Sequence, residues 1–282
     1  MQPLRLTFRE KVDVCWQKQL RDKYLSEGVP PVPHLDLERS VVRPVSRKLA
    51  EQIILKYEWL GTLPVCTHYY GIFFGVYCAG VTCVGVCVGG ANLYAYKEFG
   101  LNSQCEFAYL QRGANVHWSP VGANSKLVSW SCRLLHRETK AKVIIAYSDA
   151  DAGEIGTIYQ ACNWIYVGKG SSTNQWIAPN GRIYDQKKAS NLAKINGVLR
   201  SDVTKKLYTL GWKEQKSNPK HRYVFVLDKT DKQLIQRVEA MRKPYPKRVS
   251  GETDNAPGSN RETGGASPTE TLSELTRHPP AG

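Results

Sequence analysis

Apolar residues in the first quarter of the chain recur with the spacing of an α-helix in two places. An amphipathic helix is predicted over residues 7–26, because apolar side chains return there at every fourth position: Phe8, Val12, Trp16, Leu20 and Tyr24. Prolines just beyond this stretch end the pattern. A second helix is predicted to begin after Ser46, a suitable N-cap, and to end at Gly61, a suitable C-cap.

The next part of the chain is dense in β-branched and aromatic residues. Strands are predicted over residues 70–76 and 80–86, joined as a hairpin, followed by a loop over residues 89–104. No charged residue occurs between Trp59 and Tyr96, a stretch long enough to cross a bilayer. Its glycines and β-branched residues favour a buried hairpin or meander instead, so we expect no membrane association.

A longer strand is predicted over residues 105–118, interrupted at Arg112 and Gly113, where a bulge or a close backbone approach is expected. The loop from Pro120 to Ser125 then leads into a helix over residues 126–136. Exposed N–H groups at such a helix start favour an anion, although a capped helix with no ligand is equally compatible with this loop.

The segment from Val143 to Gly168 predicts a strand, a polar loop, a short helix and a second strand. Its shortness favours a minimal parallel crossover. Functional groups gather at the carboxyl edge of such strands, where Asp149, Asp151 and Tyr159 are expected. Asp151 is nearer the helix start and is the better candidate for a simple N-cap, whereas Asp149 lies directly at the strand end. Tyr159 faces either this edge or the core.

The last third of the chain predicts a hairpin, helices and one more strand. The hairpin pairs residues 176–178 with 182–184 around Asn180-Gly181. Helices are predicted over 188–199, 204–210 and 229–241, with a strand over 221–227. The fold class is therefore α/β, a mixed central sheet flanked by helices. The domains are an N-terminal helix and linker at 1–38, a folded domain at 39–243 with a basic C-terminal part, and a disordered tail at 244–282 rich in Pro, Gly, Ser, Thr and Glu.

The positive charge of the chain indicates a polyanionic partner. The 282-residue chain has a formal net charge of +14, and most of the excess lies between Lys187 and Arg248. Such a segment is either a solvated basic face or a nucleic-acid surface. Four aromatic residues that can stack on bases are interleaved with the charges and favour the second reading: Tyr208, Trp212, Tyr223 and Phe225.

Cysteine usage and the N-terminus bear on the compartment. The eight cysteines form no zinc-finger spacing and are interpreted as small buried side chains in a reducing cytosol. We expect no signal peptide, because charged residues interrupt the first apolar positions.

A metal site formed by Glu58 and His68 is a further candidate. The alternative is that His68 is an ordinary surface or core histidine.

The segment after Asp149 resembles the phage Mom DNA-modification proteins. Their pattern places an Asp at a strand end, ten residues before the Tyr of a Gly-x-Ile-Tyr-Gln-Ala-x-Asn-Trp segment. The matching residues here are Gly156, Ile158, Tyr159, Gln160, Ala161, Asn163 and Trp164. The order of elements also resembles the GNAT acyltransferase fold, and the whole resemblance covers residues 39–227.

The resemblance implies a transferase that replaces a hydrogen on adenine N6 of phage DNA with a carbamoylmethyl group, which protects that DNA from host restriction in the cytoplasm of the infected bacterium. It implies iron(II) and an acyl or aminoacyl donor such as acetyl-coenzyme A. A flipped adenine is expected, because N6 is inaccessible in a stacked duplex. A monomer and a homodimer both remain open.

The roles implied for individual residues follow from this reaction. Asp149 orients or deprotonates N6, Tyr159 donates a proton or binds metal with Glu58, and Arg112 holds the donor. Ser125 is a further functional position, and the donor's phosphates are expected at Gly122, Ala123, Asn124 and Ser125. DNA contacts are expected from Trp59, Lys205, Lys206, Lys220 and Arg222.

Two departures from the family pattern matter. Glu58-Trp59 stands where the family commonly has His-Tyr, and the loop from Pro120 to Ser125 lacks the full phosphate loop of acetyltransferases. Two other functions are therefore kept: a conventional acetyl-coenzyme A-dependent N-acetyltransferase acting on an amine or protein, and a non-catalytic DNA-binding protein on an acyltransferase scaffold.

Overall fold

The structure is a computed structural model that describes residues 16–26, 35–86, 90–181, 183–185, 199 and 201–247. The helix predicted over 188–199 and nearly all of the predicted tail lie outside these residues, as does the first half of the N-terminal helix. Within the described ranges no helix is both long and apolar enough to span a membrane.

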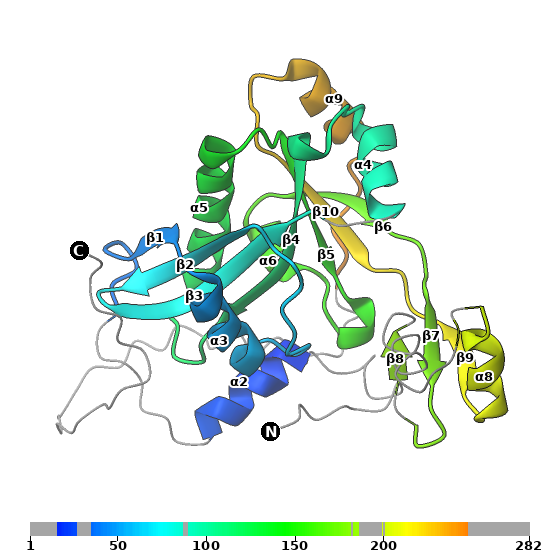
Figure 1. The fold of residues 1–282 in the computed structure, drawn as a ribbon. Helices are drawn as coiled ribbons and strands as arrows, with labels where there is room; N and C mark the ends of the chain where they lie inside the picture. The colour runs from blue at the N-terminus through cyan, green and yellow to red at the C-terminus, as the bar shows by residue number, and fades with distance from the viewer. Residues whose placement is uncertain are drawn as a thin grey trace.

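The core of the fold is a seven-stranded mixed sheet in the order β1-β2-β3-β4-β5-β10-β6 (Figure 1). Its first four strands form an antiparallel meander. β5 then lies parallel to β4, and β10 pairs antiparallel with both β5 and β6. The bounds are β1 Val41–Pro44, β2 His68–Phe74, β3 Tyr77–Gly85, β4 Phe107–Asn115, β5 Val143–Ser148, β6 Ile165–Lys169 and β10 His221–Val226.

This topology confirms the predicted α/β class and corrects one detail. The strands at either end of the crossover segment, β5 and β6, are not neighbours, because β10 lies between them. The uncharged stretch after Trp59 forms the buried hairpin of β2 and β3, as expected. Beyond that hairpin, residues predicted as a loop form helix α4, Gly90–Phe99.

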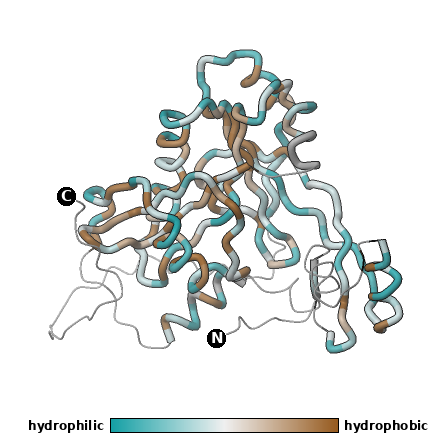
Figure 2. Tube along the Cα trace, viewed as in Figure 1, coloured by the Kyte–Doolittle hydropathy of each residue, from teal (hydrophilic) through white to brown (hydrophobic). Residues whose placement is uncertain are grey.

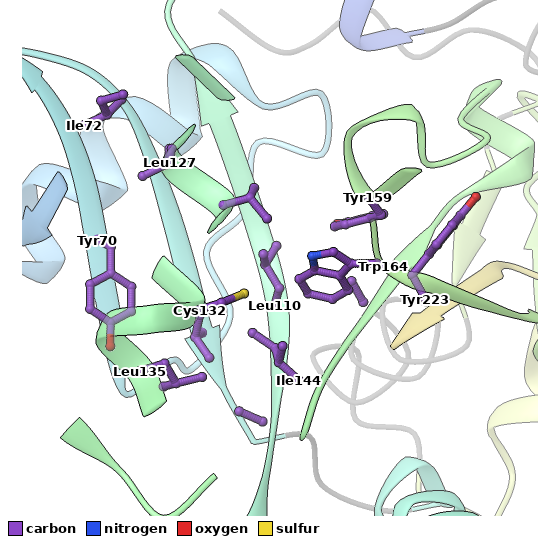
Figure 3. Close-up of a cluster of buried hydrophobic side chains, with 14 of the residues drawn as sticks. Tyr70, Ile72, Leu110, Leu127, Cys132, Leu135, Ile144, Tyr159, Trp164 and Tyr223 are labelled. Atoms are coloured by element: carbon purple, nitrogen blue, oxygen red, sulfur yellow. The ribbon is translucent and has the colours of Figure 1, made fainter. Parts of the chain in front are cut away.

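Helices cover both faces of the sheet. α5 (Ala123–Glu138) and the one-turn α6 (Thr157–Ala161) lie on one face, over a core that includes Tyr70, Leu127 and Ile144 (Figure 3). α3 (Arg47–Tyr57) covers β2 to β4 on the opposite face, and α4 and α9 (Lys232–Ala240) cover the rest of it. Figure 2 shows the hydrophobic residues concentrated along the central strands. α2 (Trp16–Ser26) packs beside α3.

Helix α3 is shorter than predicted. Ser46 caps its start by accepting a bond from the Leu49 N–H, as expected. It ends at Tyr57, however, because Glu58 already has an extended backbone conformation. The segment from Glu58 to Gly61 therefore leaves the helix axis and turns toward the edge of β4.

A small second sheet is inserted between β6 and β10, in the order β8-β7-β9. Its strands are β7 Asn174–Ile177, β8 Ile183–Asp185 and β9 Lys213–Lys216, and helix α8 (Val203–Thr209) packs on them through Trp176. The predicted hairpin is confirmed by the pairing of β7 with β8. We refer to residues 171–219 as the insertion.

The parallel pair of β4 and β5 is short. Pairing runs from Phe107–Val143 to Leu110–Ala146 and then stops, although both strands continue. On the other side of β4, the register with β3 shifts between Leu110 and Arg112, which leaves Gln111 as a bulge. The interruption predicted at Arg112 is thus present, one residue earlier, and the two strands part beyond it.

The α6 segment depends on a glycine with a left-handed backbone. Gly156 has φ +75°, and a Cβ there would lie 2.3 Å from Cε2 of Tyr223, a fully buried ring. We therefore predict that Gly156→Ala is severely destabilising, because a backbone penalty of about 1–2 kcal/mol adds to the cost of displacing a core aromatic ring.

Gly75→Ala is the matched control for this prediction. Gly75 also has a positive φ of +60°, but nothing lies within 4 Å of its Cβ position. Thermal unfolding should show a clearly larger drop in Tm for Gly156→Ala than for Gly75→Ala. Equal drops would mean that the contact with Tyr223 carries no cost.

Candidate active site

A cavity of about 250 Å³ opens where β4 and β5 part. Its walls come from the segment after α3, the bulged part of β4, the end of β5, the loop before α6 and the strand entering β10. Six residues singled out in the sequence line it together: Glu58, Trp59, Arg112, Asp149, Tyr159 and Lys220. The cavity also contains Tyr109, Tyr147 and Glu154.

Asp149 stands at the end of β5, as predicted. Its Oδ2 pairs with Nζ of Lys220 at 2.9 Å, and its Oδ1 accepts the Asp151 N–H at 3.0 Å. Asp149 is therefore the N-cap of the short 3-10 turn Ala150–Ala152. The prediction that Asp151 caps the following helix was wrong, because the N-cap of α6 is Gly156.

Asp151 instead fixes the insertion to the main domain. Its buried carboxylate accepts the Asn218 side-chain amide at 2.7 Å, the Asn218 N–H at 3.2 Å and the Gln175 side chain at 3.3 Å. One loop therefore carries both Asp149, which lines the cavity, and Asp151, which binds the insertion, so the loop fixes the insertion relative to the cavity.

Glu58 has the most unusual electrostatic environment of the cavity. Its Oε2 accepts the N–H groups of Leu60 and Gly61 at 2.9 and 3.1 Å and lies 3.9 Å from Nε of Arg112. Burial outweighs this stabilisation of the charged form and, with the nearby Glu154, raises the pKa of Glu58 from 4.5 to about 7. Glu58 therefore exchanges a proton near neutral pH.

Arg112 is held in place by the loop that follows Glu58. Its Nε donates to the Thr62 carbonyl at 3.0 Å, and its Nη1 donates to the Gln111 carbonyl at 2.6 Å. The guanidinium is partly exposed, so it keeps donor capacity for an anionic or carbonyl group in the cavity.

Glu154 was missed in the sequence, where it appeared only as the first residue of a helix. Its Oε1 accepts the indole N–H of Trp59 at 3.1 Å, and its Oε2 accepts the Asp149 N–H at 3.2 Å. Burial raises the pKa of Glu154, and the Asp149 charge raises it further. Glu154 thus orients both Trp59 and the end of β5. No local pattern identifies it, because Glu154 and Trp59 are brought together only by the fold.

Gln17 of α2 was also missed. Its side-chain nitrogen donates to the Tyr57 carbonyl and its oxygen accepts the Trp59 N–H at 3.3 Å, so it fixes the chain where α3 ends. This pair of contacts places Trp59 at the cavity from two sides.

Tyr159 lies at the inner end of the cavity. Its ring packs against Trp164 and Tyr223, with centroids 5.1 and 5.2 Å away (Figure 3). Burial raises the pKa of its phenol well above the ordinary value, so the hydroxyl stays protonated and acts as a hydrogen-bond donor. Tyr159 thus belongs to the core and to the cavity at once.

The donor set does not fit the predicted iron site. Glu58 and Tyr159 share the cavity, but the described residues contain no group of three or more His, Cys, Asp or Glu side chains able to hold a metal ion. The pKa values of Glu58 and Glu154 are raised and Asp149 is paired with Lys220, so the cavity offers little unpaired negative charge to a cation. His68 lies on β2, beside Tyr70, and does not line the cavity.

The residues predicted to bind the donor's phosphates lie apart from this cavity. Gly122 is the left-handed N-cap of α5, Ala123 donates its N–H to Pro120, and the Ser125 carbonyl accepts the Cys162 thiol. None of the four predicted positions lines the cavity: Gly122, Ala123, Asn124 and Ser125. Their predicted role remains a prediction.

The predicted DNA contacts divide into two groups. Trp59 and Lys220 line the cavity, and Lys205 and Lys206 are exposed on α8 of the insertion. Arg222, in contrast, is half-buried, with its guanidinium 3.6 Å from the centroid of the Tyr94 ring.

Comparisons with known proteins place this site in context. Among solved structures, the chain is similar to a spermidine/spermine N-acetyltransferase SpeG from Vibrio cholerae in complex with manganese ions, at 8% identity and a TM-score of 0.38, with 68% of this chain and 95% of that chain covered. It is also similar to an IAA acetyltransferase from Bacillus cereus, at 11% identity and a TM-score of 0.35, with 66% and 99% covered. At these scores the likenesses carry no conclusion about chemistry. No curated protein matches the chain significantly.

The comparison with protein-family models identifies the family of this chain. The model of the Mom protein family matches residues 39–247, which include the whole seven-stranded sheet, every cavity residue and the insertion. The chain therefore belongs to the Mom protein family.

Proposed function

We propose that this protein is a transferase that adds a carbamoylmethyl group to N6 of adenine in phage DNA and thereby protects that DNA from host restriction. The observation that carries the proposal is the cavity between the parted strands, where a proton-exchanging carboxyl, a fixed guanidinium and several aromatic rings meet in a chain of the Mom family.

The walls of the cavity suit a planar base. Adenine must leave the helical stack before a protein can reach its N6. Trp59 and Tyr147 are half-buried at the cavity and offer ring surface for a flipped base, whereas the nearly buried rings of Tyr109 and Tyr159 form its closed inner wall. A base in this position lies among Glu58, Asp149 and Glu154, whose oxygens accept hydrogen bonds from an exocyclic amine.

The transfer requires a bond exchange and one proton acceptor. The N6 nitrogen forms a bond to an electrophilic carbon of the donor as the bond from that carbon to its leaving group breaks, and N6 loses one proton. We assign the acceptor role to Glu58, because its pKa of about 7 suits proton exchange at neutral pH. Asp149 is instead engaged by Lys220, so it orients the amine rather than deprotonating it.

Arg112 and Tyr159 act on the donor in this proposal. The guanidinium points a fixed positive charge into the cavity, and the protonated phenol offers a neutral donor at its inner end. No step is assigned to iron, because the donor set does not fit it.

Long-range attraction of DNA is assigned to the insertion. Its exposed lysines include Lys205, Lys206, Lys213 and Lys216, and Lys220 continues this positive surface to the mouth of the cavity. The Asp151 contacts hold the surface in register with the cavity.

The test is the mass of the nucleosides of DNA from cells that produce the protein. We expect a modified deoxyadenosine with wild type and none with Asp149→Ala or Tyr159→Phe, at equal protein levels. Unmodified deoxyadenosine in every preparation would overturn the proposal. Acetylation of an amine substrate without DNA would favour the conventional acetyltransferase. Host protection that is unchanged in both Asp149→Ala and Tyr159→Phe would favour a non-catalytic DNA-binding protein.

The acidity of Glu58 predicts a pH profile. A base acts only when deprotonated, so the single-turnover rate should rise with pH and level off above about 7. Glu58→Gln should lower the rate by roughly 10²- to 10⁴-fold and remove this rise. Glu38→Gln, an exposed carboxyl elsewhere, should keep both rate and profile. A wild-type rate that does not change across this range would contradict the assignment of Glu58.

The insertion predicts a salt dependence. Lys205→Glu with Lys206→Glu should weaken DNA binding and reduce the slope of log affinity against log salt by about two, because two phosphate contacts are lost. The matched control is Arg47→Glu with Lys48→Glu, an adjacent exposed pair at the start of α3. Fluorescence anisotropy over a salt series measures both; an unchanged slope in the α8 variant would place the DNA elsewhere.

A further inference from the structure

A second concave surface lies on the α5 face of the sheet, outside the cavity described above. It is a groove of about 670 Å³ between one side of α5 and the segments that follow α6 and β10. We call it the α5 groove. It exists because α6 has only five residues and leaves the neighbouring part of the sheet uncovered. Its walls include Trp130 and Arg133 of α5, Trp164 and Phe225 of the sheet, and Lys229 beyond β10.

The charges of the α5 groove are all of one sign. Four basic side chains line it and no acidic one does: Arg133, His136, Arg137 and Lys229. Carboxylates act on two of these groups from outside the lining: Glu239 on Lys229 and Asp228 on His136. Among the described residues, no ion pair within 4.0 Å is found for Arg133 or Arg137, and an anion placed among the cations would be attracted by all of them.

Lys229 is partly withdrawn from solvent. Its ammonium lies 4.3 Å from the centroid of the Phe225 ring, and the Glu239 carboxylate acts on it from outside the groove lining. Burial against this ring lowers the pKa of Lys229. A bound anion would stabilise the ammonium and reverse that shift.

The groove also offers aromatic surface. Trp130 is 37% exposed, which is unusual for so large an apolar ring, and Arg133 lies 4.8 Å from its centroid. Phe225 is half-buried on the opposite wall and packs on Trp164 at 5.7 Å. Arginine beside an exposed indole is a common arrangement for holding a base and its phosphate at the same time.

We propose that the α5 groove is a second binding site, for a nucleotide, with the phosphate held among Arg133, Arg137 and Lys229 and the base against Trp130. A fully polar anion would not use the indole and phenyl surface, and an apolar ligand would leave the cations unpaired. The nucleotide is either free or part of a DNA strand, and the two sources share the same chemistry at the groove.

The site does not rest on the proposed chemistry of the cavity. Trp164, only 1% exposed, contacts both: its ring packs on Tyr159 of the cavity at 5.1 Å (Figure 3). It also packs on Phe225 of the groove at 5.7 Å. Binding in the groove is measurable without any group donor.

The experiment measures binding of two probes to the full-length protein. One is a labelled single-stranded oligonucleotide, followed by anisotropy over a salt series; the other is ADP, followed by calorimetry. The test variant is Arg133→Glu with Lys229→Glu, and Arg133→Gln with Arg137→Gln is a milder second variant at exposed positions. Arg47→Glu with Lys48→Glu is the control of equal charge change.

If the groove holds a DNA strand, the Kd for the oligonucleotide rises at least tenfold in the test variant and the salt slope falls by about two, with the control unchanged. If it holds a free nucleotide, ADP binds to wild type and to the control and is lost in both groove variants and in Trp130→Leu. Unchanged binding of both probes in both groove variants would overturn the proposal.

The outcome is independent of the modification reaction. Binding of both probes is measured on wild type, the control and the groove variants with no group donor present, so it is scored separately from the yield of modified deoxyadenosine. A protein that modifies no DNA but shows these losses would retain the groove and lose only the proposed function.

Discussion

The parting of β4 and β5 is the constraint on which the site depends. The two parallel strands pair at only four positions. Beyond these, their backbone N–H and C=O groups do not bond to each other and need other partners. The structure satisfies this region by other means: the bulge at Gln111 redirects β4, and the 3-10 turn capped by Asp149 ends β5. The cavity is what remains between them, and the residues proposed to act there come from these two strands, the segment after α3, helix α6 and the segment before β10.

Three acidic side chains line that cavity: Glu58 after α3, and Asp149 and Glu154 between β5 and α6. Ionising all three in a partly buried space is energetically unfavourable. Asp149 pairs with Lys220, while burial raises the pKa values of Glu58 and Glu154. The three carboxyls therefore have different surroundings: Asp149 is held by a lysine, Glu58 has a pKa near neutrality, and Glu154 orients Trp59 and the end of β5.

The positive charge of the chain is likewise divided by the fold. One part lies on the insertion, which Asp151 ties to the loop that carries Asp149. Another part lines the α5 groove, whose lining residues include basic side chains and no acidic one. A basic face that is only solvated would need neither the buried Asp151 contacts nor the aromatic residues of the α5 groove.

Local patterns in the sequence determined much of this protein. They predicted the α/β class, the N-cap at Ser46, the buried uncharged hairpin, the β7–β8 hairpin and the placement of Asp149 and Tyr159 at a strand edge, because each rests on neighbours within a few residues. The resemblance carried by the Gly156–Trp164 segment is confirmed by the family match. What depended on distant residues was decided only by the tertiary structure. The position of β10 between β5 and β6, the roles of Gln17 and Glu154 and the anchoring of Asn218 by Asp151 all arise from contacts tens of residues apart. So does the separation of Ser125 from the cavity, since a loop's composition shows that it can bind an anion but not which space it faces.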